Sequence, residues 1–302
     1  MEIDANRKVA RVMIFANRIA GRGRGERMAH ALEKRLGAEG FATDIFLDRA
    51  SDVPADRLTA PAEAAIVIGG DGTLRAAVER LLKADVLPPL LPVPLGTANM
   101  MAKYLGIHFH DGDLEGRVSA ALARRQILPL DAGRANGRLF LQVAGVGFDA
   151  QLIYHLDRLR RGPITFWSYM IPAFLSLVEY DPAPITVRLD GRELVNNECG
   201  MVFVGNLRQY GAGFPVLVHA RPDDGLLDVC IVKCKSRSGL IRMFLTAAAG
   251  EHIHDEDVIY LKGKHVEIDS PVKAPLQIDG DPAGHTPVRI DLLPVRLPFI
   301  VP

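Results

Sequence analysis

The segment AAIVIGGDGTLRAAVERLL, residues 64–82, joins an apolar run to a helical pattern through the motif GGDGT, residues 69–73. A strand that leads directly into a helix ends at the carboxyl edge of a parallel sheet, where ligands collect. The unpaired amides of the helix N-terminus suit phosphate, and glycines let those amides approach it without obstruction by Cβ. Asp71 would repel a phosphate unless a divalent cation, which we expect to be Mg²⁺, stands between them. The alternative is a plain glycine-rich turn in which Asp71 and Thr73 act only as helix caps.

Other strand ends carry similar loops. The run at residues 8–17 ends in the glycine-rich FANRIAGRGRG, which contains Asn17, and the run at residues 89–96 ends where Thr97 and Asn99 open a helix. Asp131 follows another strand-like run. GGDGT is not a P-loop, because no GKS or GKT follows it, and it is not a GxGxxG motif. These loops together predict a cradle for one polyphosphate.

Strands and helices alternate in the first half of the chain, with strands expected at residues 8–17, 41–48, 64–68 and 89–96 and helices after them. This alternation predicts a Rossmann-like α/β domain over residues 1–129, with a parallel sheet covered by helices on both faces. The second half contains short β-like runs, and Asn136-Gly137 and Asp190-Gly191 predict hairpin turns between them. We therefore expect a β-rich second domain over residues 130–286.

Composition narrows the functional classes and the compartment. Lys plus Arg and Asp plus Glu both number 36, which does not favour a nucleic-acid-binding protein. The three cysteines indicate a reducing compartment, and the N-terminus lacks the apolar core of a signal peptide, so we expect a cytoplasmic protein. The apolar segment at residues 163–180 is expected to be a buried helix, with a lipid-facing surface helix as the alternative.

In combination these motifs resemble the bacterial diacylglycerol kinase-like lipid kinases, which are related to sphingosine kinases and more distantly to NAD kinases and phosphofructokinases. GGDGT matches the family's motif in full, and residues 17–23 match NPxSGxG loosely. PLGTANMMAKYLGI, residues 94–107, is similar to PLGTxNDFAxxLGI, and residues 131–150 look like the start of the second domain. ARPDDGLLDV, residues 220–229, and LQIDGDP, residues 276–282, are similar to a structural metal site and a DGE motif.

The resemblance implies an ATP-dependent lipid kinase that phosphorylates a lipid hydroxyl in a cleft between the two domains. It also implies a β-sandwich second domain that binds the lipid, and a tail, residues 287–302, that returns to the first domain. The residues implied to bind ATP are Asn17, Thr43, Gly69, Gly70, Asp71, Gly72, Thr73, Thr97 and Asn99.

The same resemblance assigns the carboxylates and the metals. Asp71 and Asp131 are implied to orient Mg²⁺ indirectly, through water, and Asp71 counts among the catalytic residues. Either Asp279 or Asp281 is implied to take the proton of the lipid hydroxyl. A structural Mg²⁺ or Ca²⁺ is implied on the Asp224 side chain and the backbone carbonyls of Arg221 and Leu226.

Two departures from the family pattern keep other functions open. Met100 stands where the family has an acidic residue, and Asp281 stands where it has Glu. A catalytically weak or inactive nucleotide- or lipid-binding relative is therefore one alternative, and a kinase of a soluble substrate such as NAD is another. A metallohydrolase built on His252 and His254 is a third. The expected partners are ATP and a lipid met transiently at the inner membrane surface, without nucleic acid, and a homodimer is left open.

Overall fold

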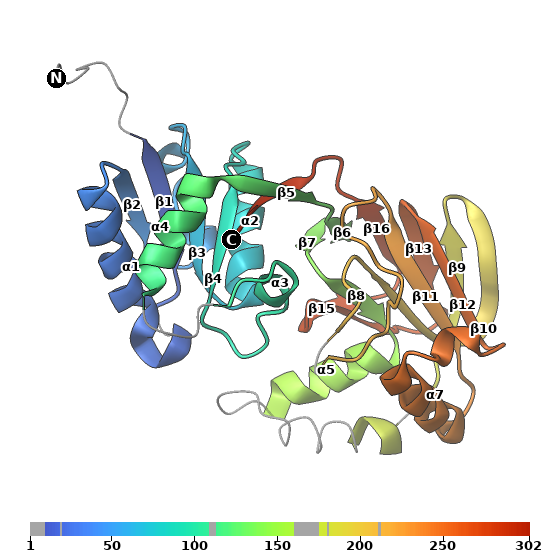
Figure 1. The fold of residues 1–302 in the computed structure, drawn as a ribbon. Coiled ribbons are helices and arrows are strands. Elements are labelled where there is room, and N and C mark those ends of the chain that lie inside the picture. Colours follow the sequence, from blue (N-terminus) through green and yellow to red (C-terminus); the bar gives the residue numbers. More distant parts are fainter. Residues whose placement is uncertain (1–9, 19, 109–112, 160–174, 180, 211–212) are drawn as a thin grey trace. The chain divides into compact units, whose positions relative to one another are not determined.

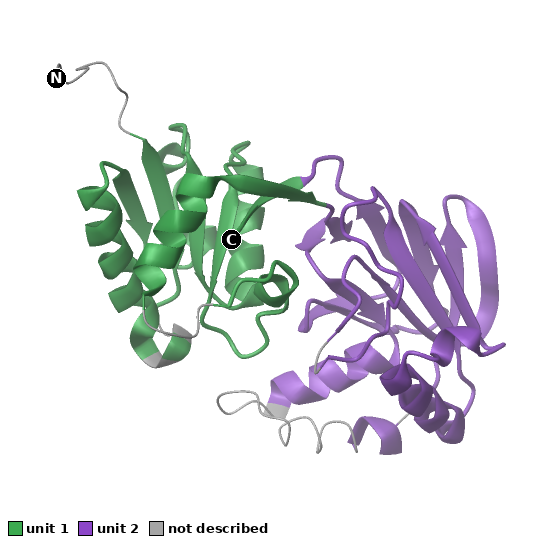
Figure 2. Ribbon diagram, viewed as in Figure 1, with its two compact units in different colours: residues 1–130, 297–302 green, residues 131–296 purple. Residues whose placement is uncertain are grey.

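The structure is a computed structural model that describes residues 10–18, 20–108, 113–159, 175–179, 181–210 and 213–302 (Figure 1). The chain divides into two compact units (Figure 2). Unit 1 comprises Met1–Leu130 and Leu297–Pro302, and unit 2 comprises Asp131–Arg296. The returning tail therefore begins at Leu297 rather than at residue 287, because residues 288–292 form a strand within unit 2.

Unit 1 is built on a six-stranded sheet with the order β2-β1-β3-β4-β17-β5. All neighbours are parallel except β5, which runs antiparallel to β17. The central strand β3 is buried along its whole length, as expected of an apolar run covered on both faces. The strands are β1 (Arg11–Ala16), β2 (Ala42–Phe46), β3 (Ala64–Gly69), β4 (Leu90–Pro94), β5 (Gln126–Leu130) and β17 (Leu297–Val301). The helices are α1 (Ala20–Ala38), α2 (Asp71–Lys83), α3 (Met100–Tyr104) and α4 (Leu114–Arg124).

The strand order places helices on both faces of this sheet. The connection β1-α1-β2 leads toward the β2 edge of the sheet, whereas the connection β3-α2-β4 leads toward the β5 edge. Because such crossovers are right-handed, α1 and α2 cover opposite faces, in agreement with Figure 1. The order reverses between β1 and β3, and such a switch point is where open α/β sheets bind their ligands. The α/β prediction for the first domain is confirmed.

Unit 2 is an antiparallel, β-rich unit whose long strand β10 is shared by two sheets. One half of β10 pairs with β9, and the other half pairs with β8 and β11. The strands are β6 (Gly133–Ala135), β7 (Arg138–Phe140), β8 (Val143–Val146), β9 (Pro184–Leu189), β10 (Arg192–Gly205), β11 (Leu227–Lys233), β12 (Val258–Gly263), β13 (His265–Asp269), β14 (Pro275–Ile278), β15 (Asp281–His285) and β16 (Val288–Leu292). The β-rich prediction for the second domain is confirmed.

The core of unit 2 has two apolar layers. One layer brings together side chains from both sheets, such as Val187 and Ile268 on one side and Val204 and Val229 on the other. The second layer packs the outer side of β10 and β11 against helices α5 (Phe148–Leu159) and α7 (Arg237–Ala249). Burial of these two layers supplies the main stabilisation of the unit.

Tight turns connect neighbouring strands in unit 2. Asn136-Gly137 joins β6 to β7, and Asp190-Gly191 joins β9 to β10, with positive φ at all four residues as a type I′ turn requires. Both hairpin predictions are confirmed. Most of the helix expected at residues 163–180 lies outside the described residues, although residues 175–178 are helical. Within the described part of the chain, no helix is both long enough and apolar enough to span a membrane.

Candidate active site

The loops that leave β1, β3 and β4 meet at one edge of the unit 1 sheet. The backbone amide of Asn17 donates to the carbonyl of Ile68 at 3.2 Å, and the amide of Leu95 donates to the carbonyl of Gly69 at 2.9 Å. The structure therefore brings Asn17, the GGDGT motif and the loop that contains Thr97 to one place, as the sequence predicts.

Close packing explains two of the glycines at this edge. A Cβ on Gly96 would lie 2.6 Å from the Cα of Gly70, and a Cβ on Gly69 would lie 2.6 Å from the Thr73 side chain. Asn99 holds the second loop, since its side chain accepts from the Gly96 amide at 2.9 Å and donates to the Gly96 carbonyl at 2.7 Å. Asn99 thus shapes the loop.

Asp71 lies at the start of α2 and fastens the two loops together. Its carboxylate accepts the backbone amides of Met100 and Met101, each at 3.0 Å, and so caps α3 across the gap between the loops. Each carboxylate oxygen accepts one amide, which leaves about two lone pairs of the carboxylate for a further contact. Water-mediated contact with Mg²⁺ stays a prediction, and the buried side chain of Met100 offers the ion no oxygen.

Gly72 has no comparable packing role. It lies in the first turn of α2, its φ is outside the left-handed region, and a Cβ built on it meets no atom within 4 Å. Glycine lowers helix stability relative to alanine by about 1 kcal/mol, so the fold alone does not favour it here. A ligand that approaches the helix amides does favour it, because Cβ would stand in the way.

The structure does not bring Thr43 to this edge. Thr43 pairs with Val12, which in turn pairs with Ala64, the first residue of β3. Gly69 is five residues farther along β3, a separation of roughly 16 Å at ~3.3 Å per residue. Thr43 therefore lies away from the GGDGT loop, because the register of β2 places it near the opposite edge, and its contact with another part of the nucleotide stays a prediction.

In unit 2, Asp279 is a structural anchor. Asp279 and Gly280 form a positive-φ turn between β14 and β15. The Asp279 carboxylate accepts the backbone amides of Leu141, Gln142 and Val143 at 2.9, 2.9 and 3.1 Å. Three such donors stabilise the charged form of a carboxylate and occupy most of its lone pairs, which makes Asp279 a poor proton acceptor.

Asp281 is the first residue of β15 and lies directly after this anchored turn. Two side chains, Gln277 and Asp149, hold this turn through successive hydrogen bonds. Gln277 accepts from the Gly280 amide at 2.9 Å and donates to the Asp149 carboxylate at 2.9 Å. Gly145 makes room for this buried carboxylate, since a Cβ there would lie 1.8 Å from Asp149 Oδ2. Asp149 and Gln277 thus position the turn that presents Asp281.

The buried Asp149 carboxylate predicts that the stability of the fold depends on pH. Burial raises the pKa of Asp149 from its ordinary value of 3.8 to about 7, against hydrogen bonds from Gln277 and Tyr210. Between these two values the folded state binds more protons than the unfolded state, so Asp149 destabilises the fold increasingly as pH rises through this window.

We expect the melting temperature of Asp149→Asn, relative to that of the unmodified chain, to rise between pH 5 and pH 8. Thermal unfolding at four pH values measures this, with Asp157→Asn, an exposed change on the same helix, as control. A difference that does not vary with pH would refute the assignment.

Asp131, the first residue of unit 2, is also held by neighbours within that unit. One carboxylate oxygen accepts the Gly225 amide at 2.6 Å, and the other accepts Nε of Arg296 at 2.9 Å. Arg296 is the last residue of unit 2, so this ion pair joins the two ends of the unit. Because the Arg296 guanidinium offsets its charge, Asp131 attracts a directly bound Mg²⁺ less than an unpaired carboxylate would. An indirect role for it also stays a prediction.

The histidines of the metallohydrolase alternative do not form a site. His252 is buried, its Nε2 lies 2.9 Å from the Val216 carbonyl, and burial lowers its pKa. His254 is exposed, and its Nε2 lies 3.7 Å from a carboxylate oxygen of Glu251. The described residues contain no group of three or more His, Cys, Asp or Glu side chains that could hold a metal ion. This alternative is therefore dropped.

Sequence reasoning missed the supporting residues. Gln277 and Asp149 are polar residues in otherwise apolar, strand-like surroundings, and that contrast was available as a signal. For Arg296 no local pattern exists, because its partner Asp131 is 165 residues away.

Comparison with known proteins gives consistent results. Residues 11–135 match the diacylglycerol kinase catalytic domain, and residues 142–301 match the YegS C-terminal NAD kinase beta sandwich-like domain. A diacylglycerol kinase of Bacillus subtilis is 31% identical over 224 residues, which cover 74% of this chain and 72% of that protein. A diacylglycerol kinase of Mycobacterium tuberculosis is 29% identical over 306 residues, which cover 98% and 96%. The crystal structure of a diacylglycerol kinase from Bacillus anthracis aligns with a TM-score of 0.68 at 20% identity, covering 98% of both chains.

Proposed function

Because this chain belongs to the bacterial diacylglycerol kinase-like lipid kinase family, we propose that it transfers the γ-phosphoryl group of ATP to the hydroxyl of a diacylglycerol-like lipid. Unit 1 binds the nucleotide, and unit 2 binds the lipid and removes its proton. The observation that carries the proposal is Gly72, a helix-opening glycine that the fold itself does not require. Mg²⁺ bound with ATP would offset negative charge on the phosphates.

Phosphate binding falls to the backbone. The α2 N-terminus presents unpaired amides beside Gly72 and Thr73, and Thr97 lies exposed on the neighbouring loop. Asp71 holds the two loops together, because its carboxylate accepts two amides at the start of α3. Electrostatic stabilisation by such fixed dipoles is a large term in phosphoryl transfer.

Proton removal falls to Asp281. The lipid hydroxyl oxygen forms a bond to the γ-phosphorus, the bond to the bridging oxygen of ADP breaks, and Asp281 takes the hydroxyl proton. Asp279 acts as a positioning residue, because its carboxylate is held by three backbone amides. This choice between the two carboxylates rests on those hydrogen bonds. Asp281 is one methylene shorter than the Glu of the family motif, so its reach depends on the rigid turn before it.

A substrate panel tests the proposal. The purified chain is incubated with Mg²⁺ and ATP labelled in the γ-phosphate, together with mixed micelles of total lipid, of diacylglycerol alone, or with NAD in solution. We expect label in lipid, and in diacylglycerol when it is the only lipid present. Label in NAD alone would overturn the lipid assignment. ATP binding without any labelled product would favour a non-catalytic relative, the alternative that Met100 keeps open.

A further inference from the structure

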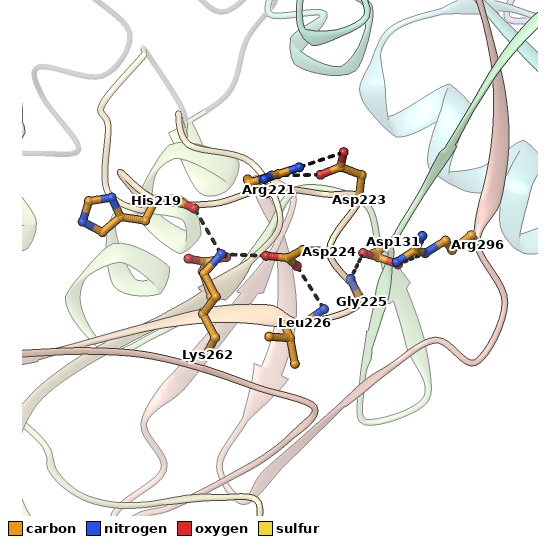
Figure 3. A network of polar contacts seen from close by, with 10 residues as sticks. Asp131, His219, Arg221, Asp223, Asp224, Gly225, Leu226, Lys262 and Arg296 are labelled. Atoms are coloured by element: carbon orange, nitrogen blue, oxygen red, sulfur yellow. Dashed lines mark hydrogen bonds and ion pairs between the residues drawn. The ribbon is translucent and has the colours of Figure 1, made fainter.

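A cluster of oxygens in unit 2 surrounds a lysine ammonium (Figure 3). Nζ of Lys262 lies 2.8 Å from Oδ2 of Asp224, 3.2 Å from the His219 carbonyl and 3.2 Å from Oδ2 of Asp228. Asp224 is the residue whose side chain the family resemblance assigns to a structural cation. The cationic group beside it in this chain is a covalent part of the protein.

The pairing of strands β11 and β12 places this ammonium. Strands β11 and β12 pair in a register that sets Lys262 directly opposite Asp228. Tyr260 lies two residues before Lys262, on the same face of β12, and its hydroxyl donates to Asp228 Oδ1 at 2.7 Å. Two strand residues thus converge on one fully buried carboxylate.

The geometry favours a charged lysine. Two carboxylate oxygens and one carbonyl oxygen lie within 3.2 Å of Nζ, and an ammonium has three N–H donors to direct at them. The Lys262 ammonium therefore offsets part of the negative charge of Asp224 and Asp228.

A divalent ion does not fit beside this ammonium. Mg²⁺ or Ca²⁺ binds oxygen at about 2.0–2.6 Å, so an ion on Asp224 Oδ2 would share the space that Nζ occupies. The other oxygen of Asp224 accepts the Leu226 amide at 3.1 Å. Asp224, the one side chain implied in the cation site, thus has the Lys262 ammonium on one oxygen and an amide on the other, and does not fit a bound divalent ion.

We propose that the Lys262 ammonium is the built-in cation of the loop at residues 219–226 and takes the place of a bound divalent ion. It ties the loop to β11 and β12 through three oxygens. This role concerns the stability of unit 2 and does not depend on the kinase assignment.

Thermal unfolding of the full chain without nucleotide tests the proposal. The melting temperature of the unmodified chain is expected to agree within about 1 °C between EDTA and millimolar Ca²⁺ or Mg²⁺, since no structural ion is lost or gained. Lys262→Met keeps the apolar stem but removes the charge, and is expected to lower the melting temperature by about 4 °C or more. Millimolar Ca²⁺ is expected to restore at least half of this loss. Lys264→Met, two residues along and exposed, is the matched control and should change nothing.

Three results would overturn the proposal: stabilisation of the unmodified chain by divalent ions, a Lys262→Met variant as stable as Lys264→Met, or a loss that Ca²⁺ does not restore. Should Lys262→Met fail to fold, equilibrium dialysis of the unmodified chain against labelled Ca²⁺ decides the question. No binding at millimolar concentration supports the built-in cation, and binding of one equivalent refutes it.

Discussion

Asp281→Asn is expected to lower the rate of phosphoryl transfer by about 100-fold or more while leaving ATP affinity and the melting temperature unchanged. Asparagine keeps the shape of the side chain but cannot accept the hydroxyl proton. The turn before residue 281 is held by Asp279 and Gln277, so the substitution should not disturb it. Steady-state transfer from labelled ATP to diacylglycerol, with nucleotide affinity measured separately, gives both quantities.

Two other variants separate proton removal from structure. Asp279→Asn replaces an anchor that accepts three amides, so it should lower the melting temperature as well as the rate. Asp269→Asn removes an exposed carboxylate of β13 that pairs with Arg188, and should change neither the rate of transfer nor the melting temperature. If Asp281→Asn retained more than about a third of the normal rate, Asp281 would not be the proton acceptor.

Gly72→Ala is expected to weaken ATP binding by about tenfold or more while the melting temperature stays equal or rises. The new Cβ meets no protein atom within 4 Å, so the fold should accept it. It would stand instead where a phosphate approaches the amides of the first turn of α2. Calorimetric titration with ATP and thermal unfolding measure the two effects on the same preparation.

Gly37→Ala provides the matched control. Gly37 also lies in a helix, α1, and a Cβ there also meets nothing within 4 Å. This variant should share any gain in stability but keep normal ATP affinity. Equal ATP affinity in both variants would show that the GGDGT loop does not hold the phosphates.

The sequence predicts the elements whose causes are local. The buried run of β3, the helix after it and the turns at Asn136-Gly137 and Asp190-Gly191 each depend on a few neighbouring residues, and each is found in the structure. The loops that meet at the edge of unit 1 follow from the geometry of parallel strands, which fixes where their carboxyl ends lie.

The errors and omissions arise where position depends on distant residues. The distance of Thr43 from the GGDGT loop could not be foreseen, because the register of β2 against β1 is set by packing and not by the sequence of β2. Asp279 and Asp281 look equivalent in LQIDGDP, and only the amides of residues 141–143 distinguish them. The partner of Asp224 is Lys262, 38 residues later, which no spacing rule indicates.

The proposed lipid kinase activity is tested most directly by the rate at which the unmodified chain transfers labelled γ-phosphate to diacylglycerol in mixed micelles. Met100 lies where the family has an acidic residue. Its side chain offers no carboxylate, and its backbone amide donates to the Asp71 carboxylate. We expect enzyme-dependent labelling of the lipid, which is lost in Asp281→Asn and in Gly72→Ala at limiting ATP. A folded chain that binds ATP yet labels no lipid would contradict the proposed activity.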